Sequence, residues 1–297
     1  MAEADPGRDA PRLGVGIMAN LALAPFISTP GALDYLAVTP DMFWIDHGPE
    51  AGPGARFADI PSWVAMLDAC GLPMVSHHIG LSIASAIPTD PAYVAQMAAW
   101  AGRWDSHWLS EHLAFVSIAE GHGPSAAGLA LTAPFDRDVL DLAVERARYV
   151  IARTGAPFLI ENSPYYVTFD DSDLEEAEFL NRFCAESGGG LLLDLHNLYC
   201  NVVNYGICGH RFLDALDLSS VIEVHIAGGS ELGGMYADSH SGAPPEPVWD
   251  LLEDLAGRAP NLRGITFEFH DSYLPVIGFD GVAAVIARAR RTWAARA

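Results

Sequence analysis

Short apolar runs bounded by turn residues recur along this chain and alternate with longer segments of helical periodicity. Runs of this kind are typical of β-strands that are buried on both faces. The predicted strands are Leu13–Met18, Leu33–Val38, Met74–His77, Trp108–Glu111, Phe158–Glu161, Leu191–Asp194, Val221–His225 and Ile265–Glu268. The predicted helices are Ser62–Cys70, Pro91–Gly102, Asp136–Thr154, Asp173–Ser187, His210–Leu216, Pro247–Leu255 and Val282–Ala295, with a loop or short helix around Ala22–Ser28.

The order of these elements indicates the fold class. Eight strands that alternate with helices fit a closed parallel barrel better than an open doubly wound sheet. We therefore predict an α/β protein, a single (β/α)8 TIM barrel over residues 12–297, preceded by a disordered tail at residues 1–11. Ile118–Pro134 and Ala227–Gly234 are predicted to be long loops on the active-site face of the barrel.

Six of the predicted strands end in a residue that can bind a metal. These residues are His77, Glu111, Glu161, Asp194, His225 and Glu268. Carboxylates and imidazoles are costly to bury unless they are paired or bound to a metal. A single such residue is more often a salt-bridged or core residue, but six strand ends need a common cause. Because barrel active sites lie at the carboxyl ends of the strands, the pattern predicts a metal site at the barrel mouth.

Further candidate ligands lie close to these six in the sequence. Asp238 and His240 follow the seventh strand, and their i, i+2 spacing lets both side chains point to the same side of an extended segment. Asn162, His196 and Asn197 are additional polar candidates. A set of about eight ligands exceeds the roughly four to six that one ion takes, so two or three ions are expected.

Three other histidines alternate with stronger candidates. His78, His112 and His270 are therefore expected to point away from the barrel interior, unless a local turn brings His112 or His270 to a substrate.

The donor types narrow the choice of metal. Imidazole and carboxylate without thiolate suit iron, manganese or zinc and disfavour iron–sulfur and copper(I) sites. Calcium takes oxygen ligands, so the several histidines argue against it. The sequence by itself does not choose between iron and zinc. Gly188–Gly190 precedes a strand and is predicted to be a turn, so it does not resemble a phosphate-binding loop.

Composition excludes some partners. With 16 Lys and Arg against 38 Asp and Glu, the formal net charge is −22, so nucleic acid and anionic membranes would repel the chain. The four cysteines form no C-x-x-C pair, and the N-terminus has no apolar signal segment. No apolar run is expected to reach the roughly 18 to 20 residues that span a bilayer. These features predict a cytoplasmic protein without a nucleic-acid or membrane partner.

At the candidate ligands the sequence resembles a known group of proteins. The order His, Glu, Glu, Asp, His, Asp-x-His, Glu resembles the xylose-isomerase-like barrel superfamily, which includes trinuclear-zinc AP endonucleases. Within it, the chain looks like the multinuclear non-haem iron-dependent oxidative (MNIO) enzymes, formerly a domain of unknown function. The segments that carry this resemblance are Ser76–Ser82, Leu109–His112, Leu159–Asn162, Leu191–Tyr199, Glu223–Gly228, Asp238–His240 and Pro245–Trp249.

The resemblance implies an oxidoreductase with two or three iron ions and dioxygen as co-substrate. It implies modification of a ribosomally synthesised precursor peptide in natural-product (RiPP) biosynthesis, often at cysteine, with a separate partner protein that binds the peptide leader. Carried over by position, the implied metal ligands are His77, Glu111, Glu161, Asp194, His225, Asp238, His240 and Glu268, with Asn162, His196 and Asn197 as further candidates. We assign catalytic roles as well to Asp238, His240 and Glu268.

The chain departs from the family pattern at two positions. Strand two usually ends in a motif with His, Ser, Glu and Asn, whereas this chain has Ala37-Val-Thr-Pro-Asp41. Many relatives carry Asp-Val-Asn-Asn after strand six, and here the third position is His196.

Two other functions compete with this interpretation. One is a divalent-metal hydrolase or isomerase of the same superfamily, acting on a sugar or phosphoester. The other is a non-catalytic binding barrel, which is disfavoured because many desolvated charges are costly to retain without a function. Metal identity separates the two enzymes.

Overall fold

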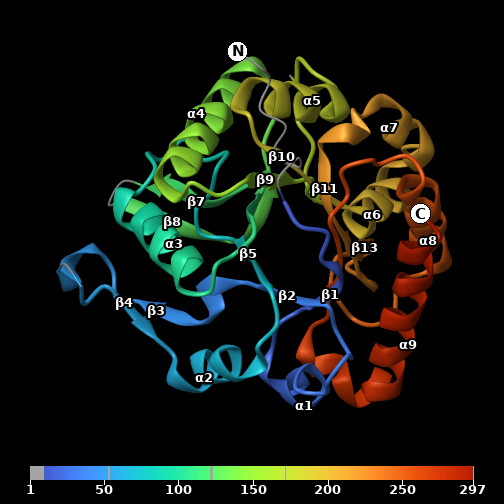
Figure 1. Cartoon of the computed structure of the whole chain (residues 1–297). Coiled ribbons are helices and arrows are strands. Elements are labelled where there is room, and N and C mark those ends of the chain that lie inside the picture. Colours follow the sequence, from blue (N-terminus) through green and yellow to red (C-terminus); the bar gives the residue numbers. More distant parts are fainter. Residues whose placement is uncertain (1–9, 53, 121–122, 171, 297) are drawn as a thin grey trace.

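The computed structural model describes residues 10–296 except residues 53, 121, 122 and 171. Eight parallel strands close into a barrel in the order β1-β14-β11-β10-β9-β6-β5-β2, with helices around the outside (Figure 1). The barrel strands are β1 (Gly14–Met18), β2 (Tyr35–Val38), β5 (Met74–His78), β6 (Leu109–His112), β9 (Phe158–Glu161), β10 (Gly190–Asp194), β11 (Val221–Ile226) and β14 (Gly264–Phe267). The predicted (β/α)8 barrel is confirmed, with strand ends that differ by one or two residues.

The helices follow the barrel strands around the outside. They are α1 (Ala24–Ile27), α2 (Pro61–Cys70), α3 (Pro91–Arg103), α4 (Arg137–Thr154), α5 (Glu176–Ser187), α6 (Leu195–Tyr205), α7 (Gly209–Ala215), α8 (Glu246–Ala256) and α9 (Leu274–Ala294). Helix α6 was not predicted from the sequence, because its β-branched, Asn and Cys residues have modest helix propensity. Asp194 at the end of β10 starts this helix, because its Oδ1 accepts a hydrogen bond of 2.6 Å from the Asn197 backbone N–H.

Three antiparallel hairpins project from the segments after β2, β6 and β11. They are β3 (Trp44–Asp46) with β4 (Phe57–Asp59), β7 (Ala114–Glu120) with β8 (Gly123–Thr132), and β12 (Ser230–Leu232) with β13 (Met235–Ala237). The predictions of plain loops at Ile118–Pro134 and Ala227–Gly234 are therefore wrong. Small residues carry weak strand propensity, but the backbone ladder of a hairpin forms without large side chains, which is why composition misled the prediction.

Two apolar clusters hold the barrel together. The larger lies between the strands and the helices. The smaller includes Tyr35, Trp108, Leu159 and Leu192 and fills the barrel floor, where Ala10 is also buried. Of the predicted tail, residues 1–9 lie outside the described residues.

Among the residues that the structure describes, one helical segment is long and apolar enough to cross a membrane by length and composition alone, which was not expected from the sequence. This segment, Asp271–Ala294, comprises α9 and the turn before it. Its Val282, Val285, Ile286 and Ala289 are buried within the large apolar cluster. Packing against the barrel accounts for these four positions, whereas most of the apolar segment is not buried.

Candidate metal centre

The carboxyl ends of the barrel strands bring five predicted ligands together in the interior. His77, Glu161, Asp194, His225 and Glu268 are each at most 5% exposed. They come from β5, β9, β10, β11 and the residue after β14. Because side chains alternate between the two faces of a strand, one residue at each strand end is directed into the barrel.

Glu161 lies at the middle of this group. Its Oε2 is 3.4 Å from His77 Nε2 and 3.1 Å from His112 Nε2. Its Oε1 is 3.3 Å from His225 Nδ1. One carboxylate is thus approached by imidazole nitrogens from three different strands.

A second set of contacts links Glu268 to the loop after β13. Glu268 Oε1 is 3.1 Å from His225 Nδ1, and its Oε2 is 3.2 Å from His240 Nε2. His240 Nε2 is also 3.0 Å from Asp238 Oδ2. His240 has a φ of 49°, in the left-handed region that is unfavourable for residues other than glycine. Such strain is often found at functional sites, and here it accompanies the return of His240 towards the barrel.

The residues fit a metal centre of more than one ion. Three overlapping groups each have ligand atoms within 4.8 Å of one another: His77, His112 and Glu161; His77, His225 and Glu268; and Glu161, Asp194, His225 and Glu268. Atoms bound to one ion at about 2.1 Å lie about 3.0–3.4 Å apart, which matches the distances around Glu161 and Glu268.

Buried atoms without hydrogen-bond partners give the same indication. Within the part of the chain that the structure describes, they include His77 Nε2, Glu161 Oε2, Asp194 Oδ2 and both ring nitrogens of His225. Unpartnered buried polar atoms are rare and costly. Bound cations would satisfy His77 Nε2, Glu161 Oε2, Asp194 Oδ2 and His225 Nδ1, whereas His225 Nε2 is directed towards Glu223.

Burial and neighbouring charges lower the pKa of some residues of the centre and raise the pKa of others. Burial, with the neighbouring imidazoles of His112 and His225, lowers the pKa of His77. Burial opposes protonation of His112 too, but the charges of Glu161 and Glu111 outweigh it and raise its pKa to about 9. Burial and the charges of Glu161 and Glu268 raise the pKa of Asp194. Protons therefore occupy part of the site in the metal-free protein, and a bound cation would replace them.

The β6 strand corrects the expectation for His112. Trp108, Ser110 and His112 face the interior, where Ser110 Oγ lies 2.9 Å from His77 Nδ1 and His112 joins Glu161. The prediction that His112 points away from the interior is wrong, because the alternate residues of β6 that face inwards are Ser110 and His112, and Glu111 faces outwards.

Glu111 lies on the opposite side of β6. Its carboxylate accepts hydrogen bonds from the backbone N–H groups of Leu81 (2.9 Å) and His112 (2.9 Å). The structure does not bring Glu111 into the three groups of ligand atoms, and its role as a ligand stays a prediction.

His78 and His270 point away from the centre, as expected. His78 is buried beside Asp41 and the Trp44 ring, and His270 is exposed beside Ser272.

The three additional polar candidates bind protein groups around the centre. Asn162 pairs with the Asp194 backbone through both ends of its amide, at 2.8 and 2.9 Å. Asn197 Nδ2 donates to the Asn162 backbone carbonyl, and its Oδ1 has no partner among the described residues. His196 Nδ1 lies 2.8 Å from Asp238 Oδ1, with its Nε2 3.4 Å from the Tyr236 hydroxyl. These contacts orient Asp194 and Asp238.

Sequence reasoning missed two further residues beside the centre. Glu223 is fully buried beneath His225, with 3.3 Å between its Oε1 and His225 Nε2. The Tyr166 hydroxyl accepts a hydrogen bond of 3.1 Å from the Asp238 backbone N–H. The i, i+2 spacing of Glu223 and His225 was the signal that could have identified Glu223.

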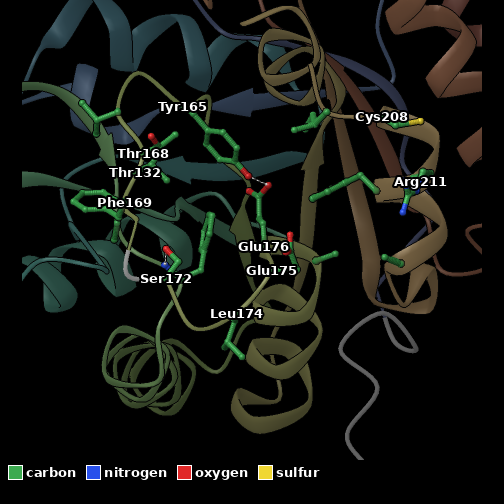
Figure 2. A pocket seen from close by; sticks show the side chains of 17 residues that line it. Thr132, Tyr165, Thr168, Phe169, Ser172, Leu174, Glu175, Glu176, Cys208 and Arg211 are labelled. Carbon is green, nitrogen blue, oxygen red and sulfur yellow. Dashed lines mark hydrogen bonds between the residues drawn. The ribbon is translucent and has the colours of Figure 1, made fainter. Parts of the chain in front are cut away.

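A cavity of about 690 Å³ lies apart from the centre, between the segment after β9, α5 and α7. Figure 2 shows its lining side chains, with Tyr165 and Glu176 joined by a hydrogen bond. Most of the wall is apolar, and Arg211 and Cys208 lie along α7 and its start. Tyr165 lines this cavity while the adjacent Tyr166 contacts Asp238, so one short segment borders both the cavity and the centre.

Comparisons with known proteins identify relatives along most of the chain. The family described as RiPP precursor modification enzyme MbnB/TglH/ChrH matches residues 12–290. A UPF0276 protein of Anaeromyxobacter sp. strain Fw109-5 is 30% identical over 82% of this chain and 84% of that protein. A UPF0276 protein of Streptomyces avermitilis is 32% identical over 77% of this chain, and the match spans 47% of that protein, about half its length.

Solved structures share the barrel at low sequence identity. A D-psicose 3-epimerase from Clostridium cellulolyticum matches with a TM-score of 0.57 at 13% identity, over 95% of this chain and 98% of that one. Endonuclease IV from Thermus thermophilus matches with a TM-score of 0.54 at 17% identity, over 96% of this chain and 100% of that one. These likenesses confirm the (β/α)8 barrel fold.

Proposed function

We propose, because the chain belongs to the MbnB/TglH/ChrH family of RiPP precursor modification enzymes, that it is a multinuclear iron-dependent oxidase acting on a precursor peptide. We place the modification at a cysteine of the peptide, with dioxygen as co-substrate and with a separate protein that binds the peptide leader. The observation that carries this proposal is the set of overlapping ligand groups at the barrel mouth.

In this proposal two or three iron ions are held by the interior side chains. His77, His112 and Glu161 would hold one ion, and Glu161, Asp194, His225 and Glu268 would hold another. Asp238 and His240 would contribute to a third position, next to Glu268. Iron, when bound, would supply the redox chemistry with dioxygen.

The protein's own part is to fix these side chains and to exclude water. Ser110 orients His77, Asn162 fixes the Asp194 backbone, and His196 together with Tyr166 orients Asp238. Ligands held by such outer contacts keep their geometry during a reaction. The side chain of His240 is 31% exposed, so it lies where a substrate would enter.

A peptide substrate suits the surface around the mouth. Large apolar side chains are exposed in the segments that follow the barrel strands: Met42, Ile45, Val167, Phe169, Leu232, Val276 and Phe279. Side chains of this kind on the segments beside a barrel mouth can supply apolar contacts to a bound peptide. The cavity beside Tyr165 would accommodate apolar side chains of such a peptide.

The alternative function, a metal-dependent hydrolase or isomerase acting on a sugar or phosphoester, is supported by the fold alone. The epimerase and the endonuclease resemble this chain at 13% and 17% identity. With 16 Lys and Arg against 38 acidic residues, the chain offers little attraction for a phosphate backbone.

The test is co-expression with a short cysteine-containing peptide encoded next to this gene and its candidate leader-binding partner, with and without oxygen. We expect a change of peptide mass that requires oxygen and iron and is lost in Glu161→Gln. Glu253→Gln, which changes an exposed carboxylate on α8 outside both the centre and the cavity, is the matched control and should retain the modification. An unchanged peptide mass, together with turnover of a sugar or phosphoester, would favour the alternative.

A further inference from the structure

Glu223 is a carboxylate in the barrel floor beneath the proposed metal centre. It is fully buried, and three side-chain donors surround it. Trp108 Nε1 donates to Oε2 at 2.6 Å, whereas the Thr266 and Tyr35 hydroxyls donate to Oε1 at 2.6 and 3.2 Å. A buried carboxylate is retained at high cost unless it is paired, so this arrangement calls for a purpose beyond packing.

The backbone of β11 is shaped to direct Glu223 inwards. Leu191 and Leu192 of β10 pair with Val221 and Glu223, so β11 contains one extra residue at this point. A bulge of this kind redirects the side chains that follow it and is rare between parallel strands. Beyond it, Glu223 and His225 lie two positions apart and share the inner face.

Gly16 and Gly264 leave space for Tyr35, whose side chain reaches across the barrel floor to Glu223. A Cβ at Gly16 would lie 2.8 Å from the Tyr35 ring, and one at Gly264 would lie 2.5 Å from the Tyr35 hydroxyl oxygen. Both distances are shorter than side chains tolerate. The floor of the barrel is therefore fitted to this polar cluster, defined as Glu223 with Tyr35, Trp108 and Thr266.

The position of His225 connects this polar cluster to the centre. Its Nδ1 faces Glu161 and Glu268, and its Nε2 lies 3.3 Å from Glu223 Oε1 on the opposite edge of the ring. A histidine that binds a metal through one nitrogen commonly donates its other N–H to a carboxylate, which fixes the tautomer and the ring orientation.

We propose that Glu223 is a positioning residue that holds the proton of His225 on Nε2 and so presents Nδ1 to the metal. This inference rests on the proposed function only in requiring that the centre binds a metal. The contact of 3.3 Å is slightly longer than a good hydrogen bond, and we expect it to shorten when Nδ1 serves as a ligand.

The variant Glu223→Gln tests this role without emptying the floor. Its amide oxygen can replace Oε2 as the acceptor for Trp108, and its amide N–H group then faces His225 Nε2 and the two hydroxyls. A donor at that position favours a proton on Nδ1, which blocks the ligand atom. Metal affinity should fall about 10- to 100-fold, as for other groups that orient metal-bound histidines.

The experiment titrates metal-free protein with Zn²⁺, a redox-inactive probe, against a chelating indicator, and measures the urea midpoint of each metal-free variant. Glu176→Gln, which removes a buried carboxylate outside the centre, is the control and should bind Zn²⁺ like the wild type. In Zn²⁺-loaded wild type, ¹⁵N-histidine NMR should show a slowly exchanging ring N–H of His225 that Glu223→Gln lacks.

Two outcomes would overturn this role. Equal Zn²⁺ affinity of Glu223→Gln and wild type would exclude a positioning effect, and weaker binding matched by a lower urea midpoint would reduce Glu223 to a structural residue. Neither measurement uses dioxygen or peptide, so the proposed oxidase activity could fail while this inference holds. If wild-type protein bound no Zn²⁺, both proposals would fall.

Discussion

The replacement Glu176→Gln should change how the stability of this protein depends on pH. Glu176 begins α5 and is buried at the wall of the cavity, with the Tyr165 hydroxyl donating to Oε2 and no partner on Oε1 among the described residues (Figure 2). Burial raises its pKa from 4.5 to about 8, although the Tyr165 hydrogen bond acts in the opposite direction. The carboxyl group is therefore mainly protonated in the folded protein at neutral pH.

The sign of the effect follows from the raised pKa. Below about pH 4.5 the group is protonated in both states and contributes no pH dependence. Between pH 4.5 and about 8 the unfolded chain releases the proton and the folded protein keeps it. The free energy of unfolding then falls by about 1.4 kcal/mol per pH unit, to an upper limit of about 5 kcal/mol. Above the folded pKa this loss is complete.

The neutral glutamine removes this dependence. Relative to wild type, Glu176→Gln should be of similar or slightly lower stability at pH 5 and more stable at pH 9, with a change in the difference of at least about 2 kcal/mol. The assay is urea denaturation of metal-free protein at pH 5, 7 and 9. Glu175→Gln makes the same charge change at the exposed neighbouring position and should run parallel to wild type. A Glu176→Gln curve parallel to wild type across this range would refute the reasoning.

Two further predictions concern the centre. Asp238→Ala and His240→Ala should each lower the iron content and abolish activity. The circular dichroism spectrum should not change, because neither residue lies in a barrel strand. Unchanged iron content in both variants would remove these residues from the ligand set. His112→Ala should lower the iron content, measured by elemental analysis, more than Glu111→Gln, because only His112 approaches Glu161; the reverse order would show that β6 presents its other face to the metal.

The barrel could be predicted from sequence because its signals are local and repeated. Each buried strand is a short apolar run, and proline and glycine mark the helix boundaries, as Pro91 and Gly155 do here. The hairpin β7–β8 could not be predicted in the same way. The residues of β8 are mostly small, so neither alternation nor a run of β-branched side chains distinguishes this strand from a loop.

The register of β6 shows why the details of the centre resist prediction. This strand carries buried polar side chains on both of its faces, so the apolar–polar alternation that would identify the inner face is absent. In Trp108-Leu-Ser-Glu-His112 either Glu111 or His112 could face the barrel. Trp108 shows which side chain faces the barrel. It belongs to the smaller apolar cluster at the barrel floor and lies four positions before His112, so both are on the same face of the strand. That assignment needs contacts with other strands, which the sequence of β6 does not contain.

Polar groups are buried at a cost in stability both at the floor of the barrel and at its mouth. Glu223, Glu161, Asp194 and His225 are all at most 1% exposed, and an apolar side chain at Glu223 would favour the metal-free fold. Metal binding raises the free energy of unfolding in proportion to the logarithm of the ratio of the metal concentration to the dissociation constant. If Glu223 strengthens metal binding 10- to 100-fold, it returns about 1.4 to 2.7 kcal/mol to the metal-bound protein. Buried Glu223 would then destabilise the metal-free barrel and stabilise the metal-bound barrel. Its role can therefore be measured only by comparing these two states.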